Sequence, residues 1–180
     1  MEDRRYLRHS GFEARAPLRV LKRLSKGSRA GGISTIDQQL IRICTGRFER
    51  SLRRKIREIF LAYSLNAHCS KSEIFHSYLK QSYFGYKLFG CIHAANFLFS
   101  KPAIHLTEEE AVFVAALLAR PLPRPIYYSV IILKEKYDIT PDLIIHLAET
   151  MQLDWADPIK LRYQYGLNNF PSTAKSLRIK

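Results

Sequence analysis

Helix-start signals recur along this chain, and they constrain its fold more than any other feature. Each signal is a side chain that can cap the first turn, followed by an acid or a proline and then by an apolar helical run. The signals are Ser70 with Glu73, Thr107 with Glu110, and Thr140 with Pro141. Strand signals are weak in comparison. The sequence therefore predicts a mostly helical, all-α fold.

Further helices are expected between these signals. Ser34, just before Thr35-Ile36-Asp37, predicts a helix start with an acid in its first turn. Apolar residues follow a helical period over Glu49–Leu65. They are Leu52, Ile56, Ile59, Phe60 and Tyr63.

The second half of the chain is less uniform. Prolines 121, 123 and 125 are expected to end a helix over Glu108–Arg120 and to mark a loop. The segment Ile126–Lys134 fits either a strand or a helix, and Asp142–Gln152 has the pattern of an amphipathic helix. Leu153–Lys180 shows few core signals, so we expect it to be partly loose.

Positive charge is concentrated in the first third of the chain. The formal net charge is +13, and the first 60 residues contribute +10 of it, from 16 Lys and Arg against 6 Asp and Glu. Such a field suits nucleic acid, anionic lipid headgroups or a pyrophosphate. Within Phe12–Ala30, leucines and a valine alternate with basic residues. This pattern fits a helix lying on an anionic membrane and an ordinary surface helix equally well.

The sequence carries no export or anchoring signal of the usual kinds. Its longest apolar run, Ala111–Ala119, is far shorter than the roughly 18 to 20 residues that span a bilayer. The N-terminus lacks the apolar core of a signal peptide. Three cysteines cannot all pair within one chain, and no spacing matches a common metal site, so we assign no metal ligands.

One charged stripe could carry chemistry. Arg50, Arg54 and Glu58 are spaced by four residues, so they share a helix face. Guanidinium groups beside a carboxylate suit a pyrophosphate leaving group. The alternative is a solvated basic face with Arg–Glu pairs, and spacing alone favours that alternative.

Four motifs, taken in order, resemble those of one enzyme family. They are Glu2–Gly11, Gly31–Gln39, Arg54–Glu58 and Tyr83–Lys101, and Leu106-Thr107 with Glu110-Ala111 continues the series. Each motif alone is weak, but their shared order and spacing are specific. The series resembles the peptidoglycan glycosyltransferases, the bacterial cell-wall enzymes found in class A penicillin-binding proteins and monofunctional transglycosylases.

The resemblance implies a lysozyme-like glycosyltransferase fold that joins lipid II to a growing glycan strand and releases polyprenyl pyrophosphate. Residues 1–125 would form the core that carries the motifs, and residues 126–180 would complete the same domain. Glu2 would take the proton from the acceptor sugar's 4-hydroxyl, and Glu58 would assist departure of the pyrophosphate. A carboxylate base is needed because a sugar hydroxyl is a poor nucleophile.

The resemblance also implies binding residues and partners. The substrate-binding residues would be Arg5, His9, Ser34, Thr35, Gln38, Gln39, Arg42, Arg50, Arg54 and Lys55. A divalent metal, Mg or Mn, would accompany the substrate pyrophosphate. Partners would be lipid II, the glycan strand, an anionic membrane surface and cell-wall synthesis proteins, at the outer, periplasmic face of the bacterial cytoplasmic membrane.

Some features depart from the family pattern. Family members carry a segment and usually a transmembrane helix before the first motif, so we expect a truncated chain, a misassigned start or a decayed relative. Lys87 and Ser100 stand where glycine is usual, and His76–Lys80 replaces E-x-Y-L-N. These changes favour an alternative function, a catalytically impaired relative that binds glycan lipid or a partner protein.

Two other function classes are weaker. A nucleic-acid-binding module is suggested only by charge and lacks a recognisable motif, so we expect no nucleic acid partner. A lysozyme-like hydrolase would share the fold, because a fold does not determine the reaction.

Overall fold

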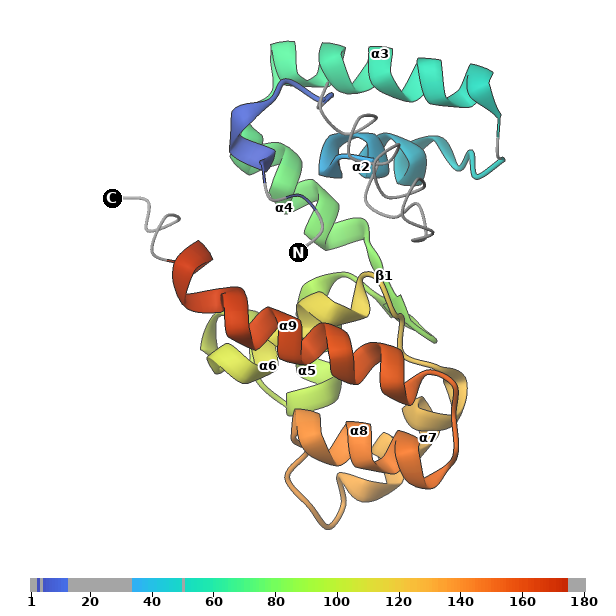
Figure 1. Cartoon of the computed structure of the whole chain (residues 1–180), viewed down its shortest axis with the longest axis vertical. Helices are drawn as coiled ribbons and strands as arrows, with labels where there is room; N and C mark the ends of the chain where they lie inside the picture. Colours follow the sequence, from blue (N-terminus) through green and yellow to red (C-terminus); the bar gives the residue numbers. More distant parts are fainter. Residues whose placement is uncertain (1–2, 4, 13–33, 50, 175–180) are drawn as a thin grey trace, which may run out of the picture. The chain divides into compact units, whose positions relative to one another are not determined.

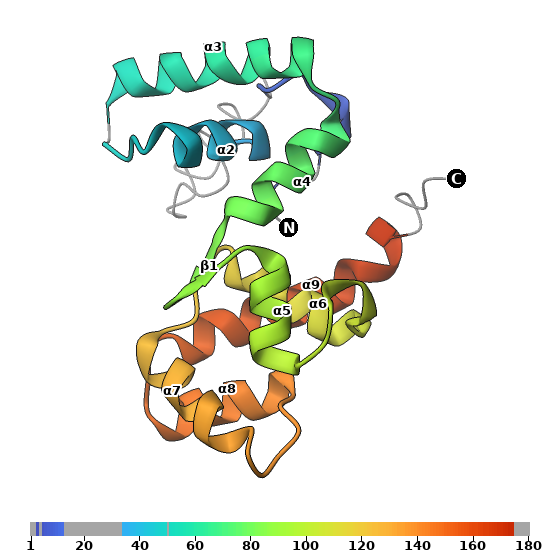
Figure 2. The same cartoon turned by 180° about the vertical axis from the view of Figure 1, so that it is seen from behind.

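The computed structural model describes residues 3, 5–12, 34–49 and 51–174, which form two compact units, Glu2–Ser82 and Tyr83–Lys180 (Figures 1 and 2). The described part is mostly helical, as predicted, with one two-stranded sheet. The first unit contains η1 (Tyr6–Arg8), α2 (Ile36–Thr45), α3 (Leu52–His68) and α4 (Lys71–Gln81).

Local capping explains where the helices of the first unit begin. Thr35, rather than Ser34, is the N-cap of α2, and its hydroxyl accepts a hydrogen bond from the backbone N–H of Gln38. Asp37 lies in the first turn, as expected. Ser70 and Glu73 form the predicted capping box at the start of α4. These helix starts follow from side-chain groups only three residues apart.

The helix α3 differs from its predicted behaviour. It starts at Leu52, three residues after the expected start, and extends to His68. Its apolar face does not form the core, because Leu52, Ile56 and Phe60 are exposed. The buried residues of α3 are instead Glu58 and Ala62. Figures 1 and 2 show α2 and α4 on one side of α3. Glu58 faces that side, because it pairs with Arg42 of α2.

The second unit packs its helices around α6. Its elements are β1 (Tyr83–Gly85), β2 (Leu88–Phe89), α5 (Cys91–Phe99), η2 (Ala103–His105), α6 (Glu108–Leu117), α7 (Arg124–Leu133), α8 (Pro141–Thr150) and α9 (Ala156–Ala174). Both α5 and α9 contact α6. The ring of Phe113 on α6 is fully buried and meets Phe99 and Tyr163 edge-on.

Predictions for the second unit had mixed outcomes. The Thr107–Glu110 capping box and the Thr140 cap before Pro141 are confirmed. The ambiguous Ile126–Lys134 segment is helical, and Pro125 lies in the first turn of α7 rather than in a loop.

The expectation that Leu153–Lys180 is partly loose is wrong for residues 156–174, and residues 175–180 lie outside the described residues. Residues Ala156–Ala174 form α9, in which Ala156, Ile159 and Tyr163 are buried. These three residues recur at helical spacing and contact neighbouring helices, so few core residues are sufficient to dock this helix.

The fourth motif forms a hairpin that we did not predict. Strands β1 and β2 pair antiparallel, and Gly85 also bridges to Leu122. A Cβ on Gly85 would lie 2.5 Å from the backbone nitrogen of Leu122, which explains the glycine. Lys87 and Ser100, which stand where the family has glycine, keep φ values of 58° and 54°. Both residues therefore adopt the left-handed backbone conformation that favours glycine.

Candidate functional site

The candidate site is centred on Glu58, a buried carboxylate on α3. Arg42 of α2 donates to it twice, from Nε to Oε1 at 2.9 Å and from Nη2 to Oε2 at 3.3 Å. Arg54 also pairs with Oε1, and Lys55 Nζ lies 3.6 Å from Oε2. Glu58 is only 2% exposed, so these three cations compensate a charge that water barely reaches.

The cations determine the ionisation of this cluster. Burial opposes the charge on Glu58, but the Arg42 hydrogen bond and the charges of Arg42, Lys55 and Arg54 outweigh it and lower its pKa. Burial also lowers the pKa of Lys55, with help from the two arginines and against the effect of Glu58. At neutral pH Glu58 is therefore a carboxylate rather than a proton donor.

Ser34 and Gln38 extend the cluster toward α2. Lys55 Nζ donates to Ser34 Oγ at 2.9 Å and to Gln38 Oε1 at 2.6 Å. Arg42 donates to the same serine oxygen at 3.3 Å. These contacts fix the two flexible cations at defined positions, as a preorganised anion site requires.

Gly11 joins the first two motifs at one carbonyl group. Its oxygen accepts hydrogen bonds from Thr35 Oγ1 at 2.8 Å and from Gln38 Nε2 at 3.0 Å. Its φ is +86°, and a Cβ there would lie 2.6 Å from the backbone of Ala62 on α3. The first motif thus lies directly against α2 and α3, and only glycine allows this approach.

A chain of charged groups fastens the first motif to α2 and α4. His9 Nε2 lies 2.9 Å from Asp3 Oδ2, which also accepts from the Ile36 backbone N–H at 3.2 Å. On the other side of the imidazole, His9 Nδ1 lies 3.8 Å from Asp37 Oδ2. Asp37 Oδ1 accepts from Lys71 Nζ at 2.9 Å. The buried acid of α2 is therefore balanced by a lysine of α4.

The negative charge of Asp3 strengthens the attachment of the first motif to α2. Burial would raise the pKa of Asp3, but the hydrogen bond and charge of His9 and the backbone N–H groups of Ile36 and Arg5 outweigh it and lower that pKa. Tyr6 adds a further link, because its hydroxyl donates to the Lys71 carbonyl at 2.7 Å. Asp3 immediately follows Glu2 in the chain, so these contacts hold the backbone next to the expected base.

We expect the first unit to lose stability as the pH falls below roughly 5. Asp3 and Glu58 have folded-state pKa values below the ordinary 3.8 and 4.5. The stability that these two carboxylates give to the first unit is complete above their ordinary pKa values. It is lost as the pH falls through their lower pKa values in the folded state. Urea unfolding followed by circular dichroism at pH 7, 5, 4 and 3 measures this. Fluorescence of Trp155 follows the second unit separately, in which the pKa of Glu110 is also lowered. Equal stability of the first unit at pH 7 and pH 3 would contradict the expectation.

The described residues do not fit a resident metal at this site. All three groups next to Glu58 are cations, which would repel a metal ion. Asp3, His9 and Asp37 have ligand atoms within 4.8 Å of one another. However, Asp3 is engaged by backbone N–H groups, and Lys71 already balances Asp37. The structure therefore supports no step through a protein-bound metal.

The remaining predicted residues fall into two groups. Gln39 accepts from the Tyr78 hydroxyl at 3.0 Å, which places its side chain against α4 rather than in the Glu58 cluster. The backbone N–H of Arg5 donates to Asp3 at 3.2 Å. Glu2, Arg50 and residues 13–30 of the predicted basic segment lie outside the described residues. Of the predicted residues, the structure thus gathers Ser34, Gln38, Arg42, Arg54 and Lys55 around Glu58.

Sequence reasoning missed Asp3, Asp37 and Lys71 as site residues. Asp3 is the second residue of the first motif. Asp37 is an acid inside the second motif, and this was a signal for a buried partner. Nothing in the sequence pointed to Lys71, because 34 residues separate it from Asp37.

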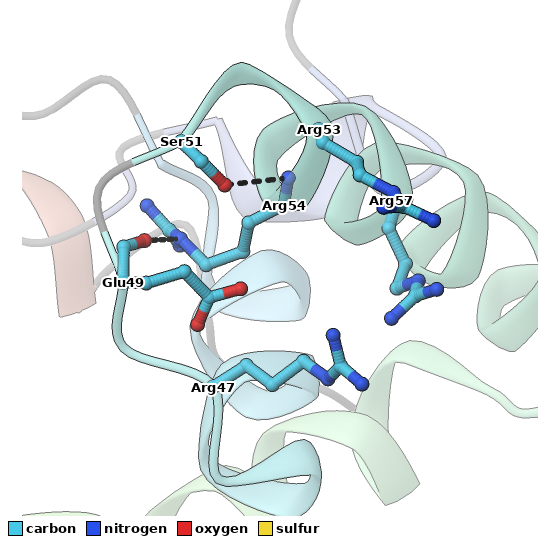
Figure 3. Close-up of a pocket in the computed structure, with 6 residues that line it drawn as sticks. All are labelled: Arg47, Glu49, Ser51, Arg53, Arg54 and Arg57. Carbon is cyan, nitrogen blue, oxygen red and sulfur yellow. Dashed lines mark hydrogen bonds between the residues drawn. The ribbon is translucent and has the colours of Figure 1, made fainter.

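A cavity of about 340 Å³ opens beside the N-terminus of α3. Its lining residues are Arg47, Glu49, Ser51, Arg53, Arg54 and Arg57. Figure 3 shows the guanidinium groups of Arg47, Arg53 and Arg57 on one side of the cavity and the Glu49 carboxylate on the other. Ser51 caps α3, so the positive end of the helix dipole adds to this field. The cavity suits an anionic group.

None of the helices that the structure describes is long and apolar enough to cross a membrane.

Comparisons with known proteins agree with the motif series. Residues 1–140 match the family model described as Transglycosylase. The chain is 38% identical to penicillin-binding protein 1A of Vibrio cholerae over 133 residues, which are 72% of this chain and 16% of that protein. It is 38% identical to the biosynthetic peptidoglycan transglycosylase of Mannheimia succiniciproducens over 128 residues, which are 71% of this chain and 51% of that protein.

A further relative aligns with almost the whole chain. Penicillin-binding protein 1A of Neisseria gonorrhoeae is 31% identical over 180 residues, which are 96% of this chain and 22% of that protein. The chain thus spans between about a sixth and a half of the length of these three relatives.

Proposed function

Because the chain belongs to the transglycosylase family, we propose that it is a peptidoglycan glycosyltransferase that polymerises lipid II. The observation that carries this proposal is the convergence of Arg42, Arg54 and Lys55 on the buried Glu58. A polyprenyl pyrophosphate leaves with growing negative charge, and fixed cations stabilise that charge without reorganising. The family relationship supplies the substrate class, and the cluster supplies a suitable leaving-group site.

In this proposal the acceptor's 4-hydroxyl oxygen attacks C1 of the donor sugar. The new C1–O bond forms as the C1–phosphate oxygen bond breaks, and the pyrophosphate keeps the electron pair. Glu2 receives the hydroxyl proton, and the adjacent Asp3 holds the backbone against α2. The cations around Glu58 receive the pyrophosphate. A divalent metal, Mg or Mn, would arrive with that pyrophosphate.

Glu58 has an organising role in this scheme. Its lowered pKa keeps it anionic, so it holds the three cations together before the substrate arrives. When the pyrophosphate binds, its oxygens take over part of the pairing. The side chains can then follow the developing charge with little movement, since both arginines are already oriented.

The proposal also places the chain at the outer, periplasmic face of the bacterial cytoplasmic membrane, where lipid-linked donor is consumed. Other cell-wall synthesis proteins would be its partners there.

The test is polymerisation of fluorescently labelled lipid II in detergent, followed by gel separation of glycan strands. We expect the chain to form polymer and Glu2→Gln to form none. Glu135→Gln, at an exposed acid in the turn after α7, serves as the matched control. A folded chain that binds lipid II without forming polymer would instead be the impaired relative. Release of short glycans from polymer without a lipid-linked donor would indicate a hydrolase.

A further inference from the structure

Two buried polar atoms face each other without a hydrogen bond where the first motif meets α2. His9 Nδ1 and Asp37 Oδ2 lie 3.8 Å apart, and neither has a hydrogen-bond partner among the residues that the structure describes. The His9 side chain is 6% exposed and the Asp37 side chain is fully buried. An unpaired polar atom inside a protein lowers its stability, so two that face each other point to a proton shared between them.

The contacts of Asp3 determine which nitrogen of the His9 ring is a donor. Asp3 Oδ2 lies 2.9 Å from His9 Nε2 and also accepts from the backbone N–H of Ile36. Burial raises the pKa of Asp3, but the His9 and backbone hydrogen bonds lower it further, so this acid is an ionised acceptor at neutral pH. Nε2 must therefore donate. A neutral imidazole has a single N–H, so its Nδ1 would present a lone pair to Asp37.

Asp37 is an acceptor as well. Its Oδ1 accepts from Lys71 Nζ of α4 at 2.9 Å and from Nδ2 of the uncharged Asn66 of α3 at 2.8 Å. Such contacts favour an ionised carboxylate, so Oδ2 also turns lone pairs toward Nδ1 of His9. Two acceptors this close repel each other, whereas a proton between them would form a hydrogen bond after an approach of about 1 Å.

The charges around the His9 ring favour the same proton. The side chains of Asp3 and Asp37 are nearly or fully buried, and Lys71 supplies one positive charge to this pair of acids. Tyr6 adds no charge, because burial and the charges of Asp37 and Asp3 raise the pKa of its hydroxyl. A second proton on His9 would supply a second positive charge, and buried charges are far less costly when they are paired.

We propose that a proton shared by His9 Nδ1 and Asp37 Oδ2 links the first motif to α2, and that Asp37 is a positioning residue for the proposed base. The proton comes from the solvent and binds a pair that otherwise carries one negative charge. The link is complete while the proton is bound, and it is lost as the pH rises and the proton leaves.

The link sets this chain apart from the family pattern. In the pattern that Gly31–Gln39 resembles, threonine stands at the position of Asp37. The positioning role rests on the proposed function, in which Glu2 is the base and directly precedes Asp3 in the sequence. The shared proton does not rest on that function, because it depends only on the contacts of His9 and Asp37.

Two substitutions at Asp37 distinguish a shared proton from a merely structural contact. Asp37→Thr removes the carboxylate. Asp37→Asn keeps the shape of the side chain and an oxygen that can accept from Lys71, and its amide N–H can donate to an unprotonated His9 Nδ1. Asp37→Asn should therefore keep the link without a bound proton, and the link should no longer depend on pH.

Nitrogen-15 NMR of the imidazole rings in the whole chain, between about pH 6 and pH 9, tests the shared proton. The signals of His9 are those that disappear in His9→Gln. We expect Nδ1 to release its proton at a pH roughly one unit or more lower in both Asp37 variants than in the parent, since both lack the carboxylate. Asp138→Thr, at an exposed acid between α7 and α8, is the matched control and should titrate like the parent.

Equal titration of His9 in the parent and in Asp37→Asn would overturn the proposal. If circular dichroism shows that Asp37→Thr is unfolded, Asp37→Asn alone decides, because it keeps the shape of the side chain.

The pH profile of lipid II polymerisation tests the positioning role of Asp37. The ratio of the parent kcat to the Asp37→Asn kcat cancels the pH dependence of the rest of the site. We expect this ratio to fall at least roughly tenfold as the pH rises and His9 releases its proton, with KM unchanged, because a hydrogen bond to a charged group is lost only in the parent. A constant ratio would overturn the positioning role.

The two proposals can fail separately. A shared proton in a chain that forms no polymer would refute the glycosyltransferase and leave the link between His9 and Asp37 standing. A chain that polymerises lipid II, but in which His9 titrates equally with and without the Asp37 carboxylate, would do the reverse.

Discussion

Replacing Glu58 with glutamine is expected to reduce lipid II polymerisation by roughly 100-fold or more. The substitution keeps the shape of the side chain but removes the charge that gathers Arg42, Arg54 and Lys55. The three half-buried cations would then repel one another and move apart. The initial rate of glycan formation from labelled lipid II, compared at matched protein concentration, measures the effect.

A loss of folding must be separated from a loss of chemistry. Glu58→Gln also removes a buried ion-pair partner, which typically lowers the free energy of unfolding by about 3–5 kcal/mol. Amide exchange in α2 and α3 at the assay temperature shows whether the variant is folded, and Glu135→Gln controls for the loss of a negative charge. If the folded variant keeps more than half of the parent rate, Glu58 does not have the role proposed here.

Replacing Gly11 with alanine is expected to detach the first motif and abolish polymerisation. The new methyl group would lie 2.6 Å from the carbonyl carbon and oxygen of Ala62, and φ at this position is +86°. Left-handed backbone strain and the overlap with the Ala62 backbone should together lower the free energy of unfolding by roughly 2–5 kcal/mol. Because Thr35 and Gln38 both donate to the Gly11 carbonyl, these two hydrogen bonds to the first motif would be lost.

Gly46 provides the matched control for this change. Its φ is +62°, but no atom lies within 4 Å of a Cβ built there. Gly46→Ala should therefore introduce the backbone strain without the overlap, and lower the free energy of unfolding by only about 1 kcal/mol. Thermal unfolding and amide exchange across residues 34–82 measure both variants. Equal effects of the two substitutions would show that close packing at Gly11 is unimportant.

The sequence predicted those parts of the fold that depend on neighbouring residues. Capping at Ser70, Thr107 and Thr140 needs only a partner three residues away, so these helix starts could be predicted. The hairpin could not, because Gly85 is held by Leu122, 37 residues later in the chain. The helix α9 was missed because few of its residues form the apolar pattern that docks it against α6 and α8.

In the candidate site, too, some residues could be predicted from the sequence and others depend on contacts between distant parts of the chain. The family resemblance selected Arg42, Arg54, Lys55 and Glu58, and these residues do meet in the structure. It gave no sign that Lys71 balances the buried Asp37, since the pairing joins α2 to α4 through the fold. Nor could periodicity alone show that the apolar face of α3 is exposed. A helical period predicts one apolar face, but it does not say what covers that face.

The two sides of α3 have a consequence for how a lipid-linked donor would reach Glu58. Pulling a hydrocarbon tail out of a bilayer costs about 0.8 kcal/mol for each CH₂ group, so a long polyprenyl chain resists extraction. With the exposed apolar face of α3 (Leu52, Ile56 and Phe60) turned toward that bilayer, only the sugar-phosphate head would have to rise, by about one helix diameter of 10–12 Å. The tail could stay dissolved among the acyl chains throughout the reaction. The thickness of a single helix would then set the height of the chemistry above the membrane.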